Sequence, residues 1–262
     1  MGLPSENFYE TLNYKINGLD KYESDCDLIC SKKKFFKRKR LCKILLRYLE
    51  TPRIWSQTDD TAYDDCILLN YWMYRELSQK YTKNNFNNLV SEFGELNLVW
   101  NDLIGDISKK SYNHTCKPDF DILNQDDWEK RKELYDYCVN YETLSGTANN
   151  YNKQTCKNIY KYIKGKADLY KHFNERCASG NEKLCPKFYS KCIDYHPDNV
   201  LHQLKCHKDM KKEEDPVPAS VGALSENTLP DVSPSRTLPP EGSQLKEQYF
   251  DIEYILFLLK NY

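Results

Sequence analysis

The cysteines limit how this 262-residue chain can fold more than any other feature of its sequence. All eleven lie between Cys26 and Cys206, and several fall in apolar stripes with the three-and-four spacing of a helix. Zinc sites need tight ligand pairs, and the nearest approaches, Cys26-x₃-Cys30 and His196-x₅-His202, do not form a zinc knuckle. The sequence therefore predicts a domain stabilised by disulfides, with no metal and no cofactor.

Ten cysteines are the candidates for these disulfides: Cys26, Cys30, Cys42, Cys66, Cys138, Cys156, Cys177, Cys185, Cys192 and Cys206. Short separations along the chain favour Cys26 or Cys30 as the partner of Cys42, and Cys177 as the partner of Cys185. Because eleven is an odd number, at least one thiol is expected to be free or to bond another chain. Disulfides would also require passage through an oxidising compartment.

The spacing of apolar residues is helical through the first 210 residues, and no segment of similar length reads as a strand. Helices are expected over residues 35–50, 61–81 and 86–107, after the acidic start at 126–129, over 156–177, and over a shorter segment at 198–206. Phe86 and Val90 are expected in the buried stripe of their helix, and residues 156–177 predict one helix of six turns. The predicted fold class is all-α: a Cys-rich multi-helix domain with disulfides, followed by a disordered Pro-rich tail.

The composition changes near residue 210. Residues 211–244 contain no aromatic residue and six of the eleven prolines, which is too little apolar surface to offset the entropy of ordering them. We therefore assign 1–210 to the helical Cys-rich domain, 211–248 to a disordered Pro-rich linker, and 249–262 to a short apolar segment, a candidate for a truncated membrane anchor. Its six consecutive apolar residues fall short of the roughly 20 that cross a bilayer. No cleaved signal peptide is expected at the N-terminus.

Seven cations within nine residues form the sharpest charge feature of a chain whose net charge is only −1. They are Lys32, Lys33, Lys34, Lys37, Arg38, Lys39 and Arg40, called the basic run below. Such a run can bind a polyanion, for example a sulfated glycan, an anionic lipid or a nucleic acid. It is equally typical of a solvated helix face whose lysine stems cover apolar surface. The near-balance of charge over the whole chain argues against nucleic acid as the partner.

No motif that carries catalysis is found. The sequence contains no G-x-S-x-G nucleophile elbow, no phosphate-binding loop and no H-E-x-x-H motif. His172 lies near Cys177 in the sequence, but proximity along the chain does not make a catalytic dyad. The acidic pair Asp126-Asp127 lies at a predicted helix start, where carboxylates interact favourably with the helix dipole. We therefore expect a protein that is not an enzyme and has no small-molecule substrate.

Three segments carry a combination of Cys, aromatic and Lys positions: CILLNYWMYREL at 66–77, LCKILLRYLE at 41–50 and KFYSKCIDYHPDNVLHQLKCH at 187–207. They resemble the Vir branch of the Plasmodium interspersed repeat (PIR) variant proteins of malaria parasites. The resemblance covers nearly all of residues 1–210, and the Pro-rich tail is similar to the family's stalk. It implies a variant antigen that the blood-stage parasite exports to the infected red cell, surface-exposed or membrane-associated if anchored.

The resemblance also implies a role in adhesion to host cells and immune evasion. The expected partner is a host-cell surface protein or glycan, and an anionic membrane surface is a second candidate. Two alternatives stay open: a soluble, unanchored interaction protein inside the infected red cell, and a nucleic-acid-binding protein that would rest on the basic run alone. The expected exposed and variable loops are the polar gaps between helices, at residues 51–60, 109–125 and 178–184.

Overall fold

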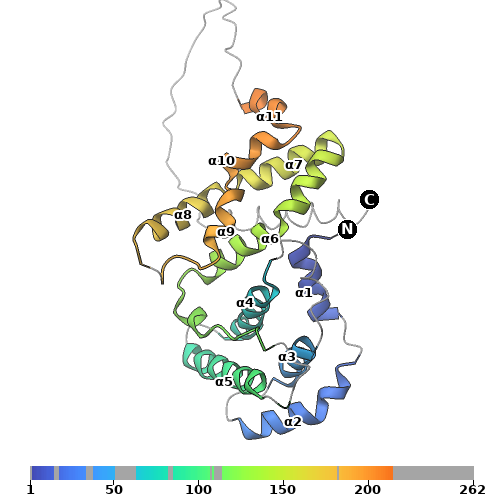
Figure 1. Ribbon diagram of the computed structural model, residues 1–262, viewed down its shortest axis with the longest axis vertical. Coiled ribbons are helices and arrows are strands. Elements are labelled where there is room, and N and C mark those ends of the chain that lie inside the picture. Colours follow the sequence, from blue (N-terminus) through green and yellow to red (C-terminus); the bar gives the residue numbers. More distant parts are fainter. Residues whose placement is uncertain are drawn as a thin grey trace, which may run out of the picture. The chain divides into compact units, whose positions relative to one another are not determined.

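The computed structural model of the chain describes residues 2–14, 18–33, 38–50, 63–81, 85–106, 108, 114–181 and 183–214. Within these ranges all regular structure is helical and no strand is present, which confirms the all-α fold class (Figure 1). Five disulfides are present, so the prediction of a disulfide-bonded protein is also confirmed. The expected linker from residue 215 onward and the apolar segment at 249–262 lie outside the described residues.

Contacts divide the chain into two compact units, where the sequence predicted one domain over residues 1–210. Unit 2 comprises residues 3–141 and 171–193, and unit 1 comprises residues 1–2, 142–170 and 194 onward. Two of the boundaries fall inside helices, namely α6 (Trp128–Asn150) and α8 (Ala167–Ala178). Composition does not change at either point, so the sequence offers no signal for this division.

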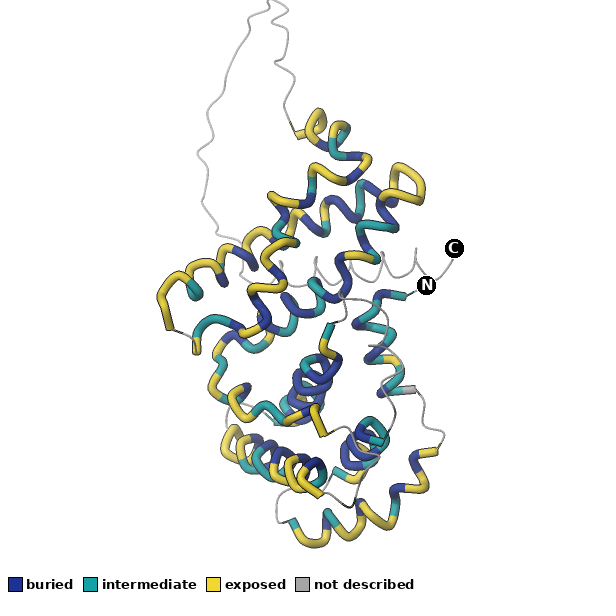
Figure 2. Tube along the Cα trace, viewed as in Figure 1, coloured by how far each residue is buried: buried dark blue, intermediate teal, exposed yellow. Residues whose placement is uncertain are grey.

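Unit 2 begins with the helices α1 (Pro4–Tyr14), α2 (Glu23–Lys32), α3 (Lys39–Glu50), α4 (Asp65–Ser78) and α5 (Phe86–Gly105). α4 is the most enclosed of them: it contacts α1 and α5, and ten of its fourteen residues are buried (Figure 2). A helix that is apolar on every side is expected to be surrounded by other elements. The carboxylate of Asp64 caps α4 by accepting a hydrogen bond from the amide of Cys66 at 2.9 Å.

α1 was not among the predicted helices, and polar contacts hold it against α6. The amide of Ser5 donates to Asn140 Oδ1 at 3.0 Å, and Asn140 Nδ2 donates to Ser5 Oγ at 2.8 Å. One turn along each helix, the Tyr9 hydroxyl donates to Asp136 Oδ1 at 2.6 Å. Burial and the Asp136 carboxylate both raise the pKa of Tyr9, so this phenol stays protonated and remains a donor. Moving four residues forward along α1, from Ser5 to Tyr9, moves the partner four residues back along α6, from Asn140 to Asp136, so the two helices run antiparallel.

The start of α5 departs from the prediction. Phe86 is 46% exposed and Val90 is 37% exposed, although both were expected in the buried stripe. The stripe that α5 buries runs through Leu89, Phe93 and Trp100, which are at most 5% exposed. Val90 follows Leu89 by one residue, so its side chain lies about 100° around the helix from that stripe. The periodicity was right, but the prediction placed the apolar face one residue out of phase at this end.

Unit 1 contains the second part of α6 and the start of α8, together with α7 (Lys153–Lys164), α10 (Pro197–Val200) and α11 (His207–Glu214). The single helix predicted over 156–177 is wrong, because α7 ends at Lys164 and α8 begins at Ala167. Gly165 lies at this break and donates its amide to Lys161 O at 2.9 Å. Apolar spacing continues across the break because both helices bury a stripe. α11 also extends the folded part four residues past the expected boundary at 210.

The three loops that were expected to be exposed differ in how far the structure agrees with the prediction. Residues 51–60 lie outside the described part of the chain. The exposed loop predicted over 109–125 is confirmed in part where it is described: six of its described residues are exposed, but Cys116 and Ile122 are fully buried and Phe120–Asn124 forms a short 3-10 helix. Trp100 Nε1 donates to the carbonyl of Cys116 at 2.9 Å, which fixes this segment against α5. The loop at 178–184 is exposed along nearly all of its described residues, as predicted.

Candidate interaction sites

The five disulfides join Cys26 to Cys42, Cys66 to Cys116, Cys138 to Cys192, Cys156 to Cys206, and Cys177 to Cys185. The first and last agree with the local pairs that short separations favoured. The candidate set needs two corrections: Cys116 was omitted and pairs with Cys66, whereas Cys30 was included and belongs to none of the five disulfides. Cys30 lies one turn after Cys26 on the buried face of α2, so spacing alone could not decide between them.

Four described residues of the basic run, Lys33, Arg38, Lys39 and Arg40, lie against carboxylates of unit 2. Arg38 binds Glu92 through two nitrogens, at 2.7 and 3.2 Å, and Glu92 is only 2% exposed. Outside this pair, Lys33 Nζ lies 4.0 Å from Asp102, Lys39 pairs with Glu23 and Asp27, and Arg40 lies 3.5 Å from Glu76. Lys34 and Lys37 lie outside the described residues, and Lys32 is exposed at the end of α2. Much of the run's charge is therefore balanced within the unit.

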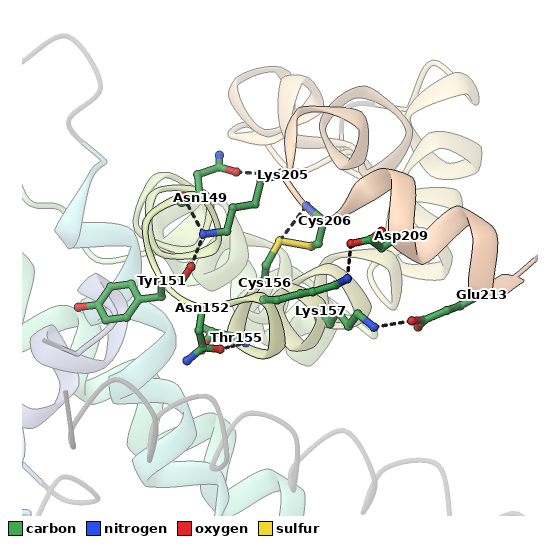
Figure 3. The surroundings of a disulfide bond; sticks show 11 residues. Asn149, Tyr151, Asn152, Thr155, Cys156, Lys157, Lys205, Cys206, Asp209 and Glu213 are labelled. Carbon is green, nitrogen blue, oxygen red and sulfur yellow. Dashed lines mark hydrogen bonds and ion pairs between the residues drawn. A yellow bond between two sulfur atoms is a disulfide. The ribbon is translucent and has the colours of Figure 1, made fainter.

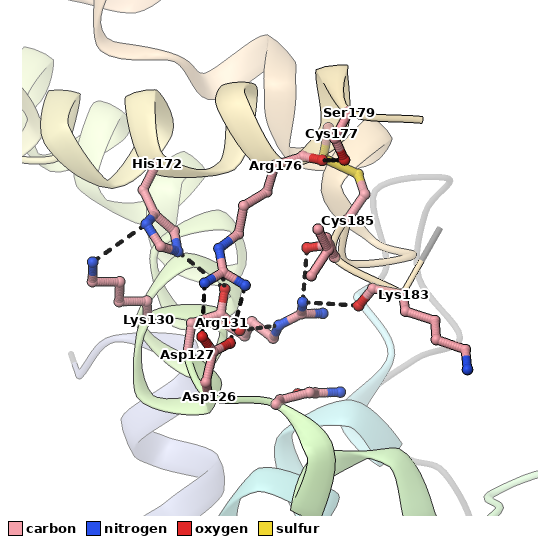
Figure 4. Close-up of polar contacts among 12 residues, drawn as sticks. Asp126, Asp127, Lys130, Arg131, His172, Arg176, Cys177, Ser179, Lys183 and Cys185 are labelled. Atoms are coloured by element: carbon pink, nitrogen blue, oxygen red, sulfur yellow. Dashed lines mark hydrogen bonds and ion pairs between the residues drawn. A yellow bond between two sulfur atoms is a disulfide. The ribbon is translucent and has the colours of Figure 1, made fainter. Parts of the chain in front are cut away.

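A buried ion network at the start of α6 forms the second cluster (Figure 4). Asp127 accepts from Arg131 Nε at 2.6 Å, and its other oxygen lies 3.0 Å from His172 Nε2 and 3.4 Å from Arg176 Nε. Burial by itself would raise the pKa of Asp127, but hydrogen bonds from Arg131 and His172 and the charge of Arg176 outweigh burial and lower it. The sequence indicated only ordinary helix-start carboxylates at Asp126-Asp127, because their partners on α8 are not visible in any local pattern.

The same network fixes both ends of the loop at 178–184. Arg176, at the end of α8, binds the two oxygens of Asp126 at 2.9 and 3.0 Å. Arg131 Nη2 donates to the carbonyl oxygens of Lys183 at 3.2 Å and Leu184 at 2.7 Å, at the far end of the loop. The Cys177–Cys185 disulfide closes the loop at its base (Figure 4). We call this arrangement the loop clamp: Asp126, Asp127, Arg131, His172, Arg176 and the disulfide.

Hydrogen bonds within the loop add to the clamp. Gly180 has a φ of 70°, a left-handed conformation that glycine adopts without steric cost. Ser179 Oγ donates to Arg176 O at 2.6 Å, and the amide of Lys183 donates to Asn181 Oδ1 at 3.0 Å. The described backbone of the loop, at 178–181 and 183–184, is therefore held in a defined shape, and its described side chains are exposed except for the half-buried Leu184.

Unit 1 carries a different arrangement around the Cys156–Cys206 disulfide (Figure 3). Three ion pairs join α7 to α11: Lys153 with Asp209, Lys157 with Glu213, and Lys164 with Glu214. We call these pairs the ion-pair ladder. Lys205 Nζ also donates to the carbonyl oxygens of Asn149, at 3.0 Å, and Tyr151, next to the end of α6, where a cation is favourable.

Both clusters are built from ion pairs, hydrogen bonds and a disulfide. No group of three or more His, Cys, Asp or Glu side chains in the described residues is arranged to hold a metal ion. None of the described helices is long and apolar enough to cross a bilayer. The loop clamp and the ion-pair ladder hold backbone and helices in place.

These features define a class of protein, a disulfide-bonded helical scaffold with an exposed, clamped loop. A family model described as Plasmodium vivax Vir protein matches residues 3–248. That match covers most of the chain, so the chain belongs to the Vir family, a family of variant surface antigens, and the resemblance in the sequence is confirmed. No curated protein and no solved structure matches the chain.

Proposed function

We propose that this chain is a non-enzymatic variant antigen that the blood-stage parasite exports to the infected red cell, where it serves host-cell adhesion and immune evasion. Membership of the Vir family supports a variant antigen of Plasmodium. The observation that supports the mode of action is the loop at 178–184. Its exposed side chains can change without touching Asp127 or Arg131, the buried residues that hold its shape.

The proposed partner is a protein or glycan of the host-cell surface. A preformed loop loses less conformational entropy on binding than a mobile one, so a small exposed surface can contribute usefully to affinity. Lys183 is the exposed charged residue of the described loop, and its backbone is already fixed by Arg131 and Asn181. Changing its side chain therefore alters recognition without removing the hydrogen bonds that shape the loop.

Binding can be tested with oxidised full-length protein on red cells and endothelial cells, read by flow cytometry. The variant Lys183→Ala is compared with Lys171→Ala, which removes the same charge from an exposed position on α8. We expect binding to fall at least fivefold for Lys183→Ala and to stay near wild type for Lys171→Ala. Equal losses would indicate nonspecific charge attraction, and no loss in either variant would remove the loop from the contact surface.

Localisation is tested separately on intact infected cells that express the tagged full chain. Protease treatment of the outside is expected to remove the signal of the folded units if the protein is displayed. A fully protected signal would favour the alternative, a soluble interaction protein inside the infected cell.

The polyanion contact of the basic run is a narrower proposal. It would depend on Lys32 and the neighbouring lysines 34 and 37, because Lys33, Arg38, Lys39 and Arg40 already face carboxylates. Heparin retention of the full chain should fall for Lys32→Gln combined with Lys34→Gln and Lys37→Gln. Retention equal to that of wild type would leave the run as a structural feature.

A further inference from the structure

We infer that the Cys177–Cys185 disulfide is a thiol-sensitive switch that opens the loop at 178–184 while the rest of unit 2 stays folded. The inference concerns a property that the proposed function does not require. Its primary readout is thiol chemistry rather than binding, so the two can succeed or fail independently.

Accessibility distinguishes this disulfide from the other four. Cys177 and Cys185 are both half-buried, whereas each of the others has a cysteine that is at most 1% exposed: Cys26, Cys116, Cys192 or Cys156. A thiol must reach a disulfide sulfur along the axis of the bond that breaks, so burial of either sulfur slows the reaction. An external thiol can approach the disulfide of the loop from the solvent side.

The length of chain that each disulfide closes also sets the Cys177–Cys185 disulfide apart from the other four. Cys177 and Cys185 are 8 positions apart, whereas three of the other disulfides span 50 to 54 positions and the fourth spans 16. A short cross-link restricts the unfolded chain less than a long one, so breaking it removes less stability. Reduction at this position is therefore expected to be both the fastest and the best tolerated.

The ion pairs and hydrogen bonds of the loop clamp, without its disulfide, explain why the fold survives reduction. After the sulfur–sulfur bond breaks, Arg176 still binds Asp126 and Arg131 still holds the carbonyls of Lys183 and Leu184. Both ends of the loop thus stay attached to the start of α6. Between these anchors, the hydrogen bonds of Gly180 and Asn181 lose the covalent closure that supports them. The reduced loop is expected to sample more conformations, and its surface is no longer preformed.

The chemistry balances with glutathione or a similar small thiol as the reductant. A glutathione thiolate attacks the sulfur of Cys177 or Cys185, forming a mixed disulfide and releasing the other cysteine as a thiolate, which takes up a proton. A second glutathione thiolate displaces the protein sulfur, yielding glutathione disulfide and two protein thiols. Two electrons pass from the glutathione pair to the protein disulfide. The loop would therefore be cross-linked in an oxidising environment and open in a cytosol rich in glutathione.

The test uses the oxidised full chain, incubated with reduced glutathione and sampled over time by alkylation and peptide mass spectrometry. Cys177 and Cys185 are expected to become alkylated at least tenfold faster than the cysteines of the other four disulfides. Earlier reduction of another pair, or simultaneous reduction of all five, would overturn the inference.

Hydrogen exchange on the same samples tests the opening itself. After selective reduction, the amides of Gly180 and Asn181 should exchange at least tenfold faster, while the amides of α6 keep their protection. The double variant Cys177→Ser/Cys185→Ser is the matched control: it should show the open loop from the start and no further change with glutathione. An unchanged exchange rate in the reduced loop would mean that the ion pairs and hydrogen bonds of the clamp fix it without the disulfide and that no switch exists.

Discussion

The buried network of unit 2 and the ion-pair ladder of unit 1 both pair basic with acidic side chains, but to different effect. In unit 2, the side chains of Asp127 and Arg131 are 4% and 5% exposed. In unit 1, the lysines and carboxylates of the ladder are 20 to 64% exposed. A charge that is buried without its partner cannot be solvated by water, whereas an exposed one can. Burial, rather than the number of ion pairs, therefore decides which cluster the fold depends on.

The largest expected effect comes from Arg131→Met. The substitution leaves Asp127 buried without its closest partner and removes the donor to the carbonyls of Lys183 and Leu184. Breaking a buried ion pair in this way costs about 3–5 kcal/mol of unfolding free energy. Denaturant unfolding monitored by circular dichroism measures the loss.

The double variant Asp127→Leu/Arg131→Met is the control for this change. Removing both charges leaves no uncompensated charge in the core, so most of the lost stability should return. A loss below 1 kcal/mol for Arg131→Met would mean that the site is solvated, and the contrast between the two clusters would fail.

Removing one disulfide from each unit gives a second comparison between unit 1 and unit 2. Cys156 and Cys206 are 50 positions apart, and loop-closure entropy predicts a loss of about 4 kcal/mol for their serine variants. Cys177 and Cys185 are 8 positions apart, and the same relation predicts about 2.6 kcal/mol. Thermal unfolding of the two double serine variants tests the order of these stability losses. A free-thiol count on each variant checks that its other disulfides have formed. The opposite order would mean that the disulfide of the loop supports more structure than the loop itself.

Much of the fold could be predicted because the spacing of apolar residues within a short segment indicates a helix. A helix was expected over residues 35–50, and Leu41, Leu45 and Leu49 within it, spaced four residues apart, are at most 4% exposed. α1 was not predicted, although Phe8 and Leu12 are buried in it; its polar contacts, such as Ser5 with Asn140, join partners 135 positions apart that no local pattern reports. The break at Gly165 was missed because two helices in sequence can keep one apolar period.

The candidate sites were less predictable than the helices. The pairing of Cys177 with Cys185 was expected because it is local. Arg131 was not singled out, although its spacing of four residues from Asp127 fits a pair on one helix face. The contributions of His172 and Arg176 depend on how α8 packs against α6, which no local pattern reports.

Acid pH should weaken the loop clamp. Arg176 lowers the pKa of Asp126, and the pKa of Asp127 is also lowered. A carboxyl whose pKa is lower in the folded state stabilises the fold above its unfolded pKa, about 3.9, and this contribution is lost as pH falls through the folded value. The variant Arg176→Gln should therefore be less stable than wild type at pH 6, with the difference shrinking below about pH 4. A difference that stays constant from pH 6 to pH 2.5 would contradict the role of these carboxylates.

The smallest effect is expected in the ladder. Lys157→Ala and Glu213→Ala each remove one side of an ion pair between α7 and α11, and water can solvate the charge that remains. Met210, which is 3% exposed, and the Cys156–Cys206 disulfide continue to hold α11 in place. Both variants should unfold at the wild-type denaturant midpoint, and raising the salt concentration to 1 M should change wild type and variants alike. A clear loss in either variant would show that the ladder, although exposed, carries stability comparable to a buried pair, and that exposure alone does not separate the two clusters.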